Sequence, residues 1–199
     1  ALAAEADEAA AQNALASGDT TSALEQLQHA VATDPANDDA RFDYVKLLLQ
    51  EGRIDDAKVA FAPVIAKTSA VRRLDSLQRW MDAIDAQHPV PADMAALDAA
   101  IAANRRDFDA RYARAQALMA AQRWTDALDE LLDILMRDKH WNEDLARKTY
   151  IAILDIMEPP KPAVPEGQIP PADPAMAAHP RRLPSVVLGW PSPGPCPPL

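Results

Sequence analysis

The chain is poor in glycine, in aromatic residues and in the β-branched runs that form strands. It has 199 residues with 5 Gly, and 5% of the residues are aromatic. Only Gly18 and Gly52 lie before residue 158, so this alanine-rich stretch holds almost no glycine to break a helix. These shortages argue against an all-β or α/β fold and predict an all-α body.

Proline is distributed in the opposite way. Of the 18 Pro, 14 lie after Met157. Because proline lacks a backbone donor and clashes with the preceding helical turn, helices are not expected there. We therefore expect a helical domain over residues 1–158 and a Pro-rich, disordered tail over residues 159–199.

Cysteine and long apolar runs are also scarce. Cys196 is the single cysteine, so the chain can form neither an internal disulfide nor a zinc site with several cysteine ligands. The longest apolar stretch, 59–66, is far shorter than the roughly 20 residues of a membrane span, and the first residues, Ala1–Glu5, lack the basic region and apolar core typical of a leader segment. We expect a cytoplasmic protein with no membrane partner. A first residue of Ala rather than Met is compatible with a piece of a longer protein.

Positive charge is the minority sign. The chain has 20 Lys and Arg against 30 Asp and Glu, a formal net charge of −10. Because nucleic-acid binding requires a basic face, no nucleic-acid partner is expected. The densest basic cluster is Arg72, Arg73 and Arg79. Asp75 and Asp82 lie one helical turn away, so we interpret this cluster as a self-paired, solvated face, with an acidic partner as the alternative.

The sequence offers no catalytic or metal-binding motif. Its histidines, His29, His88, His140 and His179, are scattered, and there is no Gly-rich phosphate loop. The acidic pairs at 38–39 and 55–56 fall at predicted helix starts, where carboxylates cap backbone N–H groups. We therefore predict a non-enzymatic protein without cofactor or metal, and an enzyme is a distant third possibility.

A 34-residue repeat is the strongest signal. Ser17-Gly18-Asp19 returns as Glu51-Gly52-Arg53, and Ala23 returns as Ala57. A third copy follows after a further 70 residues, which leaves room for one divergent unit of 36. Its matches are Asp39-Ala40-Arg41-Phe42 with Asp109-Ala110-Arg111-Tyr112, and Ala57 with Ala127. Units of this length hold two helices and stack on each other to bury a shared core.

The helices are expected near 4–16, 20–32, 38–50, 54–66, 72–87, 92–103, 108–121, 124–137 and 142–157. Pro63 should kink or shorten the fourth, and Gln122, where other copies have glycine, should be strained by a left-handed conformation. Asn142 is predicted to cap the last helix, with Trp141 packing on the preceding unit. The sequence thus predicts a right-handed α-solenoid of about four helix pairs with a C-terminal capping helix.

The spacing of small and large residues resembles the tetratricopeptide repeat. Residues 4–157 also resemble the C-terminal repeat region of the thioredoxin-like co-chaperones known as YbbN or CnoX. The residues that carry this likeness lie in Ala95–Ala103, Asp107–Tyr112, Arg123–Leu128 and Asp138–Lys148. That resemblance implies a thioredoxin-fold domain upstream and, as partners, unfolded client proteins, a GroEL-type chaperonin or a DnaK-type chaperone. The family's chaperonin-docking end is only partly matched, by Asp173-Pro174 and Arg181-Arg182-Leu183, because Pro180 and Pro184 interrupt it.

In tetratricopeptide arrays the first helix of each pair lines a concave binding face. If that arrangement holds here, protein partners would contact six residues: Phe42, Lys46, Leu49, Tyr112, Gln116 and Met119. The same residues could instead be packed core, and the two interpretations are evenly balanced. The main alternative function is a repeat scaffold for self-association or for assembly of an unrelated complex.

Overall fold

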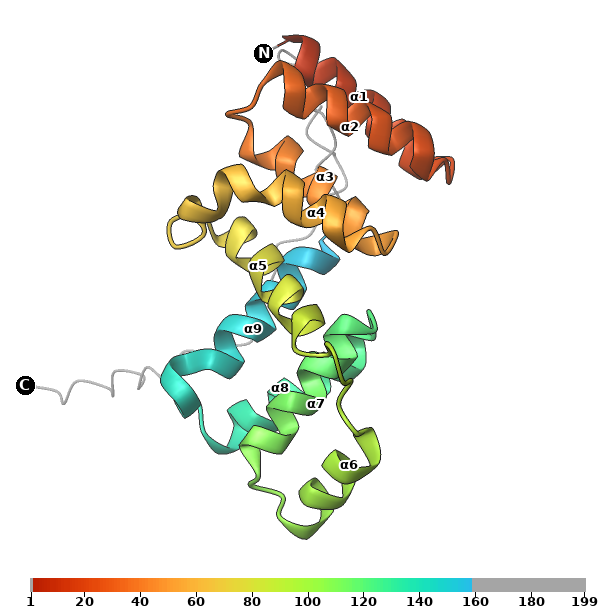
Figure 1. The fold of residues 1–199 in the computed structure, drawn as a ribbon. Helices are drawn as coiled ribbons and strands as arrows, with labels where there is room; N and C mark the ends of the chain where they lie inside the picture. The colour runs from red at the N-terminus through yellow and green to blue at the C-terminus, as the bar shows by residue number, and fades with distance from the viewer. Residues whose placement is uncertain (1, 159–199) are drawn as a thin grey trace, which may run out of the picture. The chain divides into compact units, whose positions relative to one another are not determined.

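The chain divides into two units, Ala1–Ala163 and Val164–Leu199, and the computed structural model describes residues 2–158 of the first. Those residues form helices joined by short turns, without a strand (Figure 1). The helices are α1 Leu2–Ala16, α2 Thr20–Thr33, α3 Asp38–Gln50, α4 Ile54–Phe61, the 3-10 helix η1 Ala62–Lys67, α5 Arg72–Asp85, α6 Met94–Ala103, α7 Phe108–Ala120, α8 Trp124–Arg137 and α9 Trp141–Met157. The all-α prediction is confirmed. The predicted tail, including Cys196 and the 173–174 and 181–183 motifs, lies outside the described residues.

Short polar side chains begin several of the helices. Asp19, Asn37, Asp93 and Asp107 each accept a hydrogen bond from a backbone N–H of the first helical turn, at 2.9 to 3.1 Å. Such caps satisfy donors that have no partner within the helix. The acidic pairs at 38–39 and 55–56 lie in first turns as predicted.

The repeated turn requires a left-handed residue. Gly18 has φ +81° and Gly52 has φ +74°, and both end the first helix of a pair. Gln122 occupies the corresponding place with φ 57°, so the left-handed conformation predicted there is confirmed. Its side-chain Nε2 donates to the carbonyl of Gln50 at 3.2 Å, which links the turn after α7 to the turn after α3.

Pro63 ends α4 early, as predicted. The α-helix stops at Phe61, and the chain continues as η1 with Pro63 near its start. The carbonyl of Ala60 accepts a hydrogen bond from Arg41 Nη1 at 2.9 Å. The buried arginine of α3 therefore satisfies a carbonyl beside the break.

Helix pairs α1 and α2, α3 and α4, and α7 and α8 pack directly, and α2 packs on α3 (Figure 1). The alanines at the shared repeat position, Ala23, Ala57 and Ala127, have no exposed surface. Small side chains at these contacts let the helices approach closely. The described residues thus stack as helix pairs, as an α-solenoid requires.

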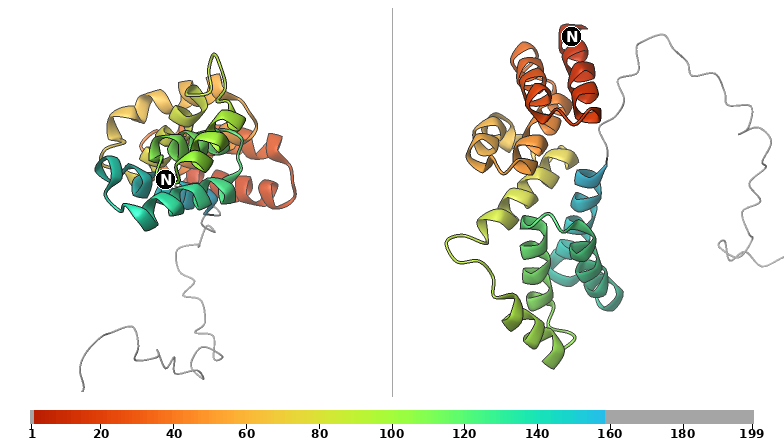
Figure 2. Two further views of the ribbon diagram at one scale, coloured as in Figure 1. Left: turned by 90° about the horizontal axis from the view of Figure 1, so that it is seen from below. Right: turned by 90° about the vertical axis from the view of Figure 1, so that its right-hand side faces the viewer.

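The second half departs from simple stacking. Helices α5, α7, α8 and α9 pack in a ring, each on the next, and Figure 2 shows α9 beside α5 and α8. Their shared core includes Ala83, Met119, Leu131 and Ile153, one residue from each helix. The C-terminal helix therefore covers an apolar face of the preceding helices and also closes a four-helix core.

Helix α6 does not pair with α5 as the divergent unit had suggested. It packs on α7 and has no fully buried residue, and Arg114 of α7 pairs with Asp98 of α6 at 2.7 Å. Alanine-rich α6 offers too little apolar surface to cover the large side chains of α5. Helix α9 supplies that surface instead, through Ile153 and Ile156.

Two tryptophans join the cores of the two halves. Trp80 of α5 is fully buried, and its ring meets that of Trp124 edge-on with centroids 4.8 Å apart. Trp124 packs against both core clusters. This contact fixes the start of α8 on α5.

The start of α9 differs from the prediction. His140 rather than Asn142 is the N-cap residue, and no side chain caps this end. Asn142, Glu143 and Asp144 instead have positive φ, between 46° and 64°. Trp141 packs as predicted, with its ring centroid 5.5 Å from that of Tyr112 in α7.

The left-handed turns give a testable difference in stability. A Cβ placed at Gly52 meets nothing within 4 Å, so only the backbone conformation opposes a side chain there. We expect Gly52→Ala to lower the free energy of unfolding by about 1 kcal/mol and Gln122→Gly to raise it by about 0.5–1 kcal/mol. Urea denaturation would measure both changes.

Gln122→Ala is the control, because it removes the side-chain hydrogen bond but keeps the Cβ. If Gln122→Gly proved no more stable than Gln122→Ala, strain at this turn would be rejected.

Candidate functional site

The three predicted face residues of α3 lie on one side of that helix. Phe42 and Leu49 are buried in the core shared by α3 and α5, and Lys46, between them, is largely buried. A buried apolar side chain offers no surface to a partner. In this structure, therefore, only Lys46 of the three keeps a polar group at the edge of the face.

The three predicted residues of α7 divide in a similar way. Met119 is fully buried in the four-helix core, whereas Tyr112 and Gln116 are half-buried. Sequence reasoning left open whether these positions are groove or core. The structure places Phe42, Leu49 and Met119 in the core and also buries most of Lys46, whereas Tyr112 and Gln116 stay half-buried.

Helix α9 contacts both sets of face residues. Lys46 Nζ donates to the carbonyl of Glu158, just past the end of α9, at 2.9 Å. The hydroxyl of Tyr112 lies 3.1 Å from Thr149 Oγ1 of α9. The chain's own helix thus covers part of the surface that the sequence assigned to a partner.

A buried polar contact anchors α9 on α5. Asp155 is almost fully buried, and one of its oxygens accepts a hydrogen bond from Ser76 Oγ at 3.1 Å. The other pairs with Arg72 at 2.9 Å. Within the basic cluster of α5, only Arg79 pairs with its own helix, with Asp75 at 2.8 Å. The self-paired face predicted from sequence is therefore wrong for Arg72 and Arg73, whose carboxylate partners lie on α9 and α3, and Asp82 bonds to Gln78 rather than to an arginine.

Two cations flank the ring of Phe42. The guanidinium carbon of Arg73 is 4.0 Å from the ring centroid and Lys46 Nζ is 6.0 Å away. Arg73 also pairs with Asp39 and, at 3.6 Å, with Asp43. Burial lowers the pKa of the Lys46 ammonium, and Arg73 lowers it further, while Asp43 and Glu158 oppose the shift.

Burial also raises the pKa of the Tyr112 hydroxyl, and the hydrogen bond to Thr149 opposes that rise. The hydroxyl therefore stays protonated well above neutral pH and can donate or accept a hydrogen bond.

Within residues 2–158, no cluster of three or more His, Cys, Asp or Glu side chains could hold a metal ion. Over the same residues, no helix is both long enough and apolar enough to span a bilayer.

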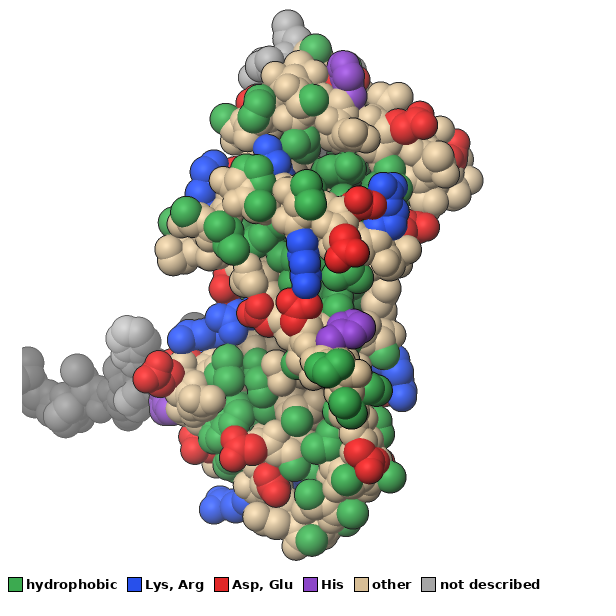
Figure 3. Space-filling model, viewed as in Figure 1, with side chains coloured by type: hydrophobic (Ala, Val, Ile, Leu, Met, Phe, Trp, Pro, Cys, Tyr) green, Lys and Arg blue, Asp and Glu red, His purple; other side chains and the backbone are tan. Residues whose placement is uncertain are grey.

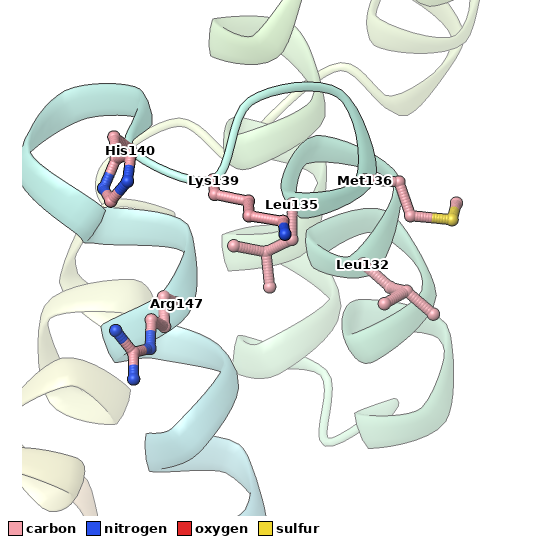
Figure 4. Close-up of a pocket in the computed structure, with 6 residues that line it drawn as sticks. All are labelled: Leu132, Leu135, Met136, Lys139, His140 and Arg147. Carbon is pink, nitrogen blue, oxygen red and sulfur yellow. The ribbon is translucent and has the colours of Figure 1, made fainter. Parts of the chain in front are cut away.

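A second feature lies between α8 and α9, and the sequence did not indicate it. It is an open pocket of about 420 Å³. Figure 4 shows its residues: Leu132, Leu135 and Met136 on α8, Lys139 and His140 in the connection, and Arg147 on α9. Leu132 of α8 is 43% exposed. One feature of the sequence could have indicated this pocket: apolar residues continue around α8 beyond the width of a single buried face.

The surface around these features is mixed in charge. In Figure 3, acidic and basic side chains lie side by side near the middle of the displayed face, and hydrophobic side chains gather beside them. This agrees with the many ion pairs between neighbouring helices, such as Lys58 with Asp85 at 2.6 Å and Lys67 with Asp38 at 2.8 Å.

Comparison with protein families identifies the class. Residues 14–81 match one tetratricopeptide-repeat model and residues 86–169 match another. The chain therefore carries tetratricopeptide repeats, the repeat class of helical protein-interaction modules. No curated protein matches the sequence.

Lys46 allows a test of what its burial costs. We expect Lys46→Met to raise the free energy of unfolding at pH 7 by about 1 kcal/mol, because methionine fills the same space without a desolvated charge. The exposed lysine Lys58, which pairs with Asp85, is the control, and Lys58→Met should change stability by less than about 0.5 kcal/mol.

The pH dependence has a definite sign. The folded-state pKa of Lys46 lies below its unfolded value, so the unfolded chain binds more protons between the two values. Wild-type stability should therefore rise relative to Lys46→Met as pH increases through that alkaline window, below about pH 10.4. Urea titrations at several pH values would measure the difference in free energy of unfolding between the two proteins. If that difference stayed constant with pH, the buried charge of Lys46 would not be its cause.

Proposed function

We propose that this chain is the non-enzymatic protein-interaction module of a cytoplasmic, thioredoxin-like co-chaperone. Its ligands would be unfolded client proteins, a GroEL-type chaperonin or a DnaK-type chaperone. The observation that carries the proposal is the match of both halves of the helical region to tetratricopeptide repeats. Arrays of such repeats act through surface contacts with proteins and require neither nucleotide nor metal.

The accessible part of the concave face has suitable chemistry for a peptide. Tyr112 supplies a hydroxyl on an aromatic ring and Gln116 a side-chain amide, and both residues are half-buried rather than enclosed. Amides and hydroxyls can hydrogen-bond an extended backbone, and the ring adds apolar contact area. These groups suit a ligand of variable sequence better than a single small molecule.

The co-chaperone assignment rests on the resemblance of residues 4–157 to the YbbN or CnoX repeat region. Segment 107–112 forms the start of α7, segment 123–128 the start of α8, and segment 138–148 the connection to α9 and its first turns. Segment 95–103 lies in α6, so the resemblance covers α6 and parts of α7, α8 and α9, the last three of which belong to the four-helix core. A thioredoxin-fold domain encoded directly upstream would support the assignment, and a different upstream domain would oppose it.

Self-association is the second candidate function. Val59 of α4 is 75% exposed and Ile65 of η1 is 56% exposed, so the surface near this helix presents apolar side chains to solvent. A scaffold that assembles through them would oligomerise as its concentration increases, whereas a client-binding module would stay monomeric. Light scattering over a concentration series separates the two.

Photo-crosslinking tests the concave face without disturbing the core. We replace Gln116 with p-benzoylphenylalanine and mix the full chain with chemically unfolded citrate synthase as the client. Position 116 should crosslink to the client because it lies on the accessible part of the face. The same substitution at exposed Val59 on α4 is the matched control and should crosslink at a level about tenfold lower.

Equal crosslinking at both positions would argue against a defined face. Absence of client crosslinks at position 116, with circular dichroism showing an intact fold, would remove the concave face from the proposal.

A further inference from the structure

Helix α8 has two apolar sides, and only one of them is buried. Ala127, Leu131 and Ile134 pack in the four-helix core without exposed surface. On the other side, Leu132 is 43% exposed and Met136 is 68% exposed. Leu135 is half-buried between the two sides and forms part of the pocket wall.

The exposed side forms a groove rather than isolated residues. Leu132, Leu135 and Met136 have the spacing i, i+3 and i+4, so they follow one another along a single turn of α8. They line the pocket of about 420 Å³ between α8 and α9 (Figure 4). No other helix among residues 2–158 covers it. Contiguous exposed apolar side chains of this kind indicate an interaction site.

Free cations border the groove. Lys139 and Arg147 line it, and within residues 2–158 neither has a carboxylate partner. Most other arginines of these residues do: the paired ones include Arg53, Arg72, Arg73, Arg79, Arg111, Arg114, Arg123 and Arg137. In a chain with net charge −10, two cations without a carboxylate partner among residues 2–158 thus line this apolar groove, beside His140, which bonds to Asp144.

We propose that the groove between α8 and α9 docks an acidic amphipathic helix of a partner protein. Apolar side chains of the partner, spaced i, i+3 and i+4, would pack on Leu132 and Met136, and its Asp or Glu side chains would pair with Lys139 and Arg147. This site is separate from the concave face and does not depend on the function proposed there.

Charge favours this occupant over two others. A second copy docked symmetrically would bring its own Lys139 and Arg147 toward the same cations, and like charges in a contact oppose binding. The segment 159–199 has Lys161, Arg181 and Arg182 against Glu166 and Asp173, so it does not offer the excess of carboxylates that the groove requires.

Fluorescence anisotropy tests the proposal. The probe is a labelled 18-residue peptide with leucines along one helical face and glutamates beside them, titrated with the full 199-residue chain. A scrambled peptide of the same composition controls for charge alone. We expect the ordered probe to bind at least about tenfold more tightly than the scrambled one.

Two pairs of variants locate the site. Met136→Asp and Arg147→Glu should each weaken binding of the ordered probe by about tenfold or more, because one removes apolar contact and the other a cation. Val59→Asp is the control for Met136→Asp, since Val59 is also an exposed apolar residue. Lys148→Glu is the control for Arg147→Glu: it makes the same charge change on the next residue of α9, which does not line the groove. Both controls should change the Kd by less than about twofold.

A photo-crosslinker in place of Met136 identifies the occupant in the full chain. Crosslinks to the ordered probe support the proposal. Crosslinks to a second copy or to residues 159–199 in preference to the probe would overturn it. So would equal affinity for the ordered and scrambled peptides, or equal effects of Arg147→Glu and Lys148→Glu.

Discussion

The packing of α9 against α5 and α8 is the contact on which the rest of the second half depends. Ile153 fills the four-helix core, and Ile156 reaches the core shared by α3 and α5, so one helix touches both clusters. Buried Asp155 fixes its position through Ser76 and Arg72. Because a buried carboxylate without partners would be strongly unfavourable, this polar contact selects one register of α9 along α5. The same packing determines which surfaces remain open.

In two of the repeats, a buried arginine links the two helices of a pair, but the groups that accept its hydrogen bonds differ. Arg41 and Arg111 occupy equivalent positions and are equally buried. Arg111 pairs with Glu130 and Asp133 of α8 at 2.9 and 2.7 Å. The position equivalent to Asp133 is Pro63, which ends α4, and Arg41 instead binds the carbonyl of Ala60. In both copies the guanidinium joins the two helices of a pair, through carboxylates in one copy and through the carbonyl of Ala60, three residues before Pro63, in the other.

Local features were predictable from sequence because each depends on a few neighbouring residues. The helix boundaries, the break at Pro63 and the left-handed Gln122 follow from backbone sterics and repeat alignment. The position of α9 was not predictable, since it depends on contacts such as Ser76 with Asp155, 79 residues apart. The burial of Phe42 and Met119 was not predictable for the same reason. Helical periodicity shows that each lies on the same side of its helix as accessible residues. It does not show which other helix packs against that side. The cap expected at Asn142 failed because Asn142, Glu143 and Asp144 have positive φ, a left-handed conformation that interrupts the first turn of α9.

Two kinds of cation distinguish the surfaces of this module. Lys46 is buried beside Arg73, and its charge opposes folding. An apolar side chain would fit the same place in the core, so stability does not explain why a lysine is found there. Lys139 and Arg147 are exposed, and leaving them unpaired costs folding almost nothing. Their charge alone is therefore weak evidence of function. At the α8–α9 groove these cations lie beside Leu132 and Met136, whose exposed apolar surface loses the free energy that burial would provide. A partner helix that covers this surface recovers that free energy.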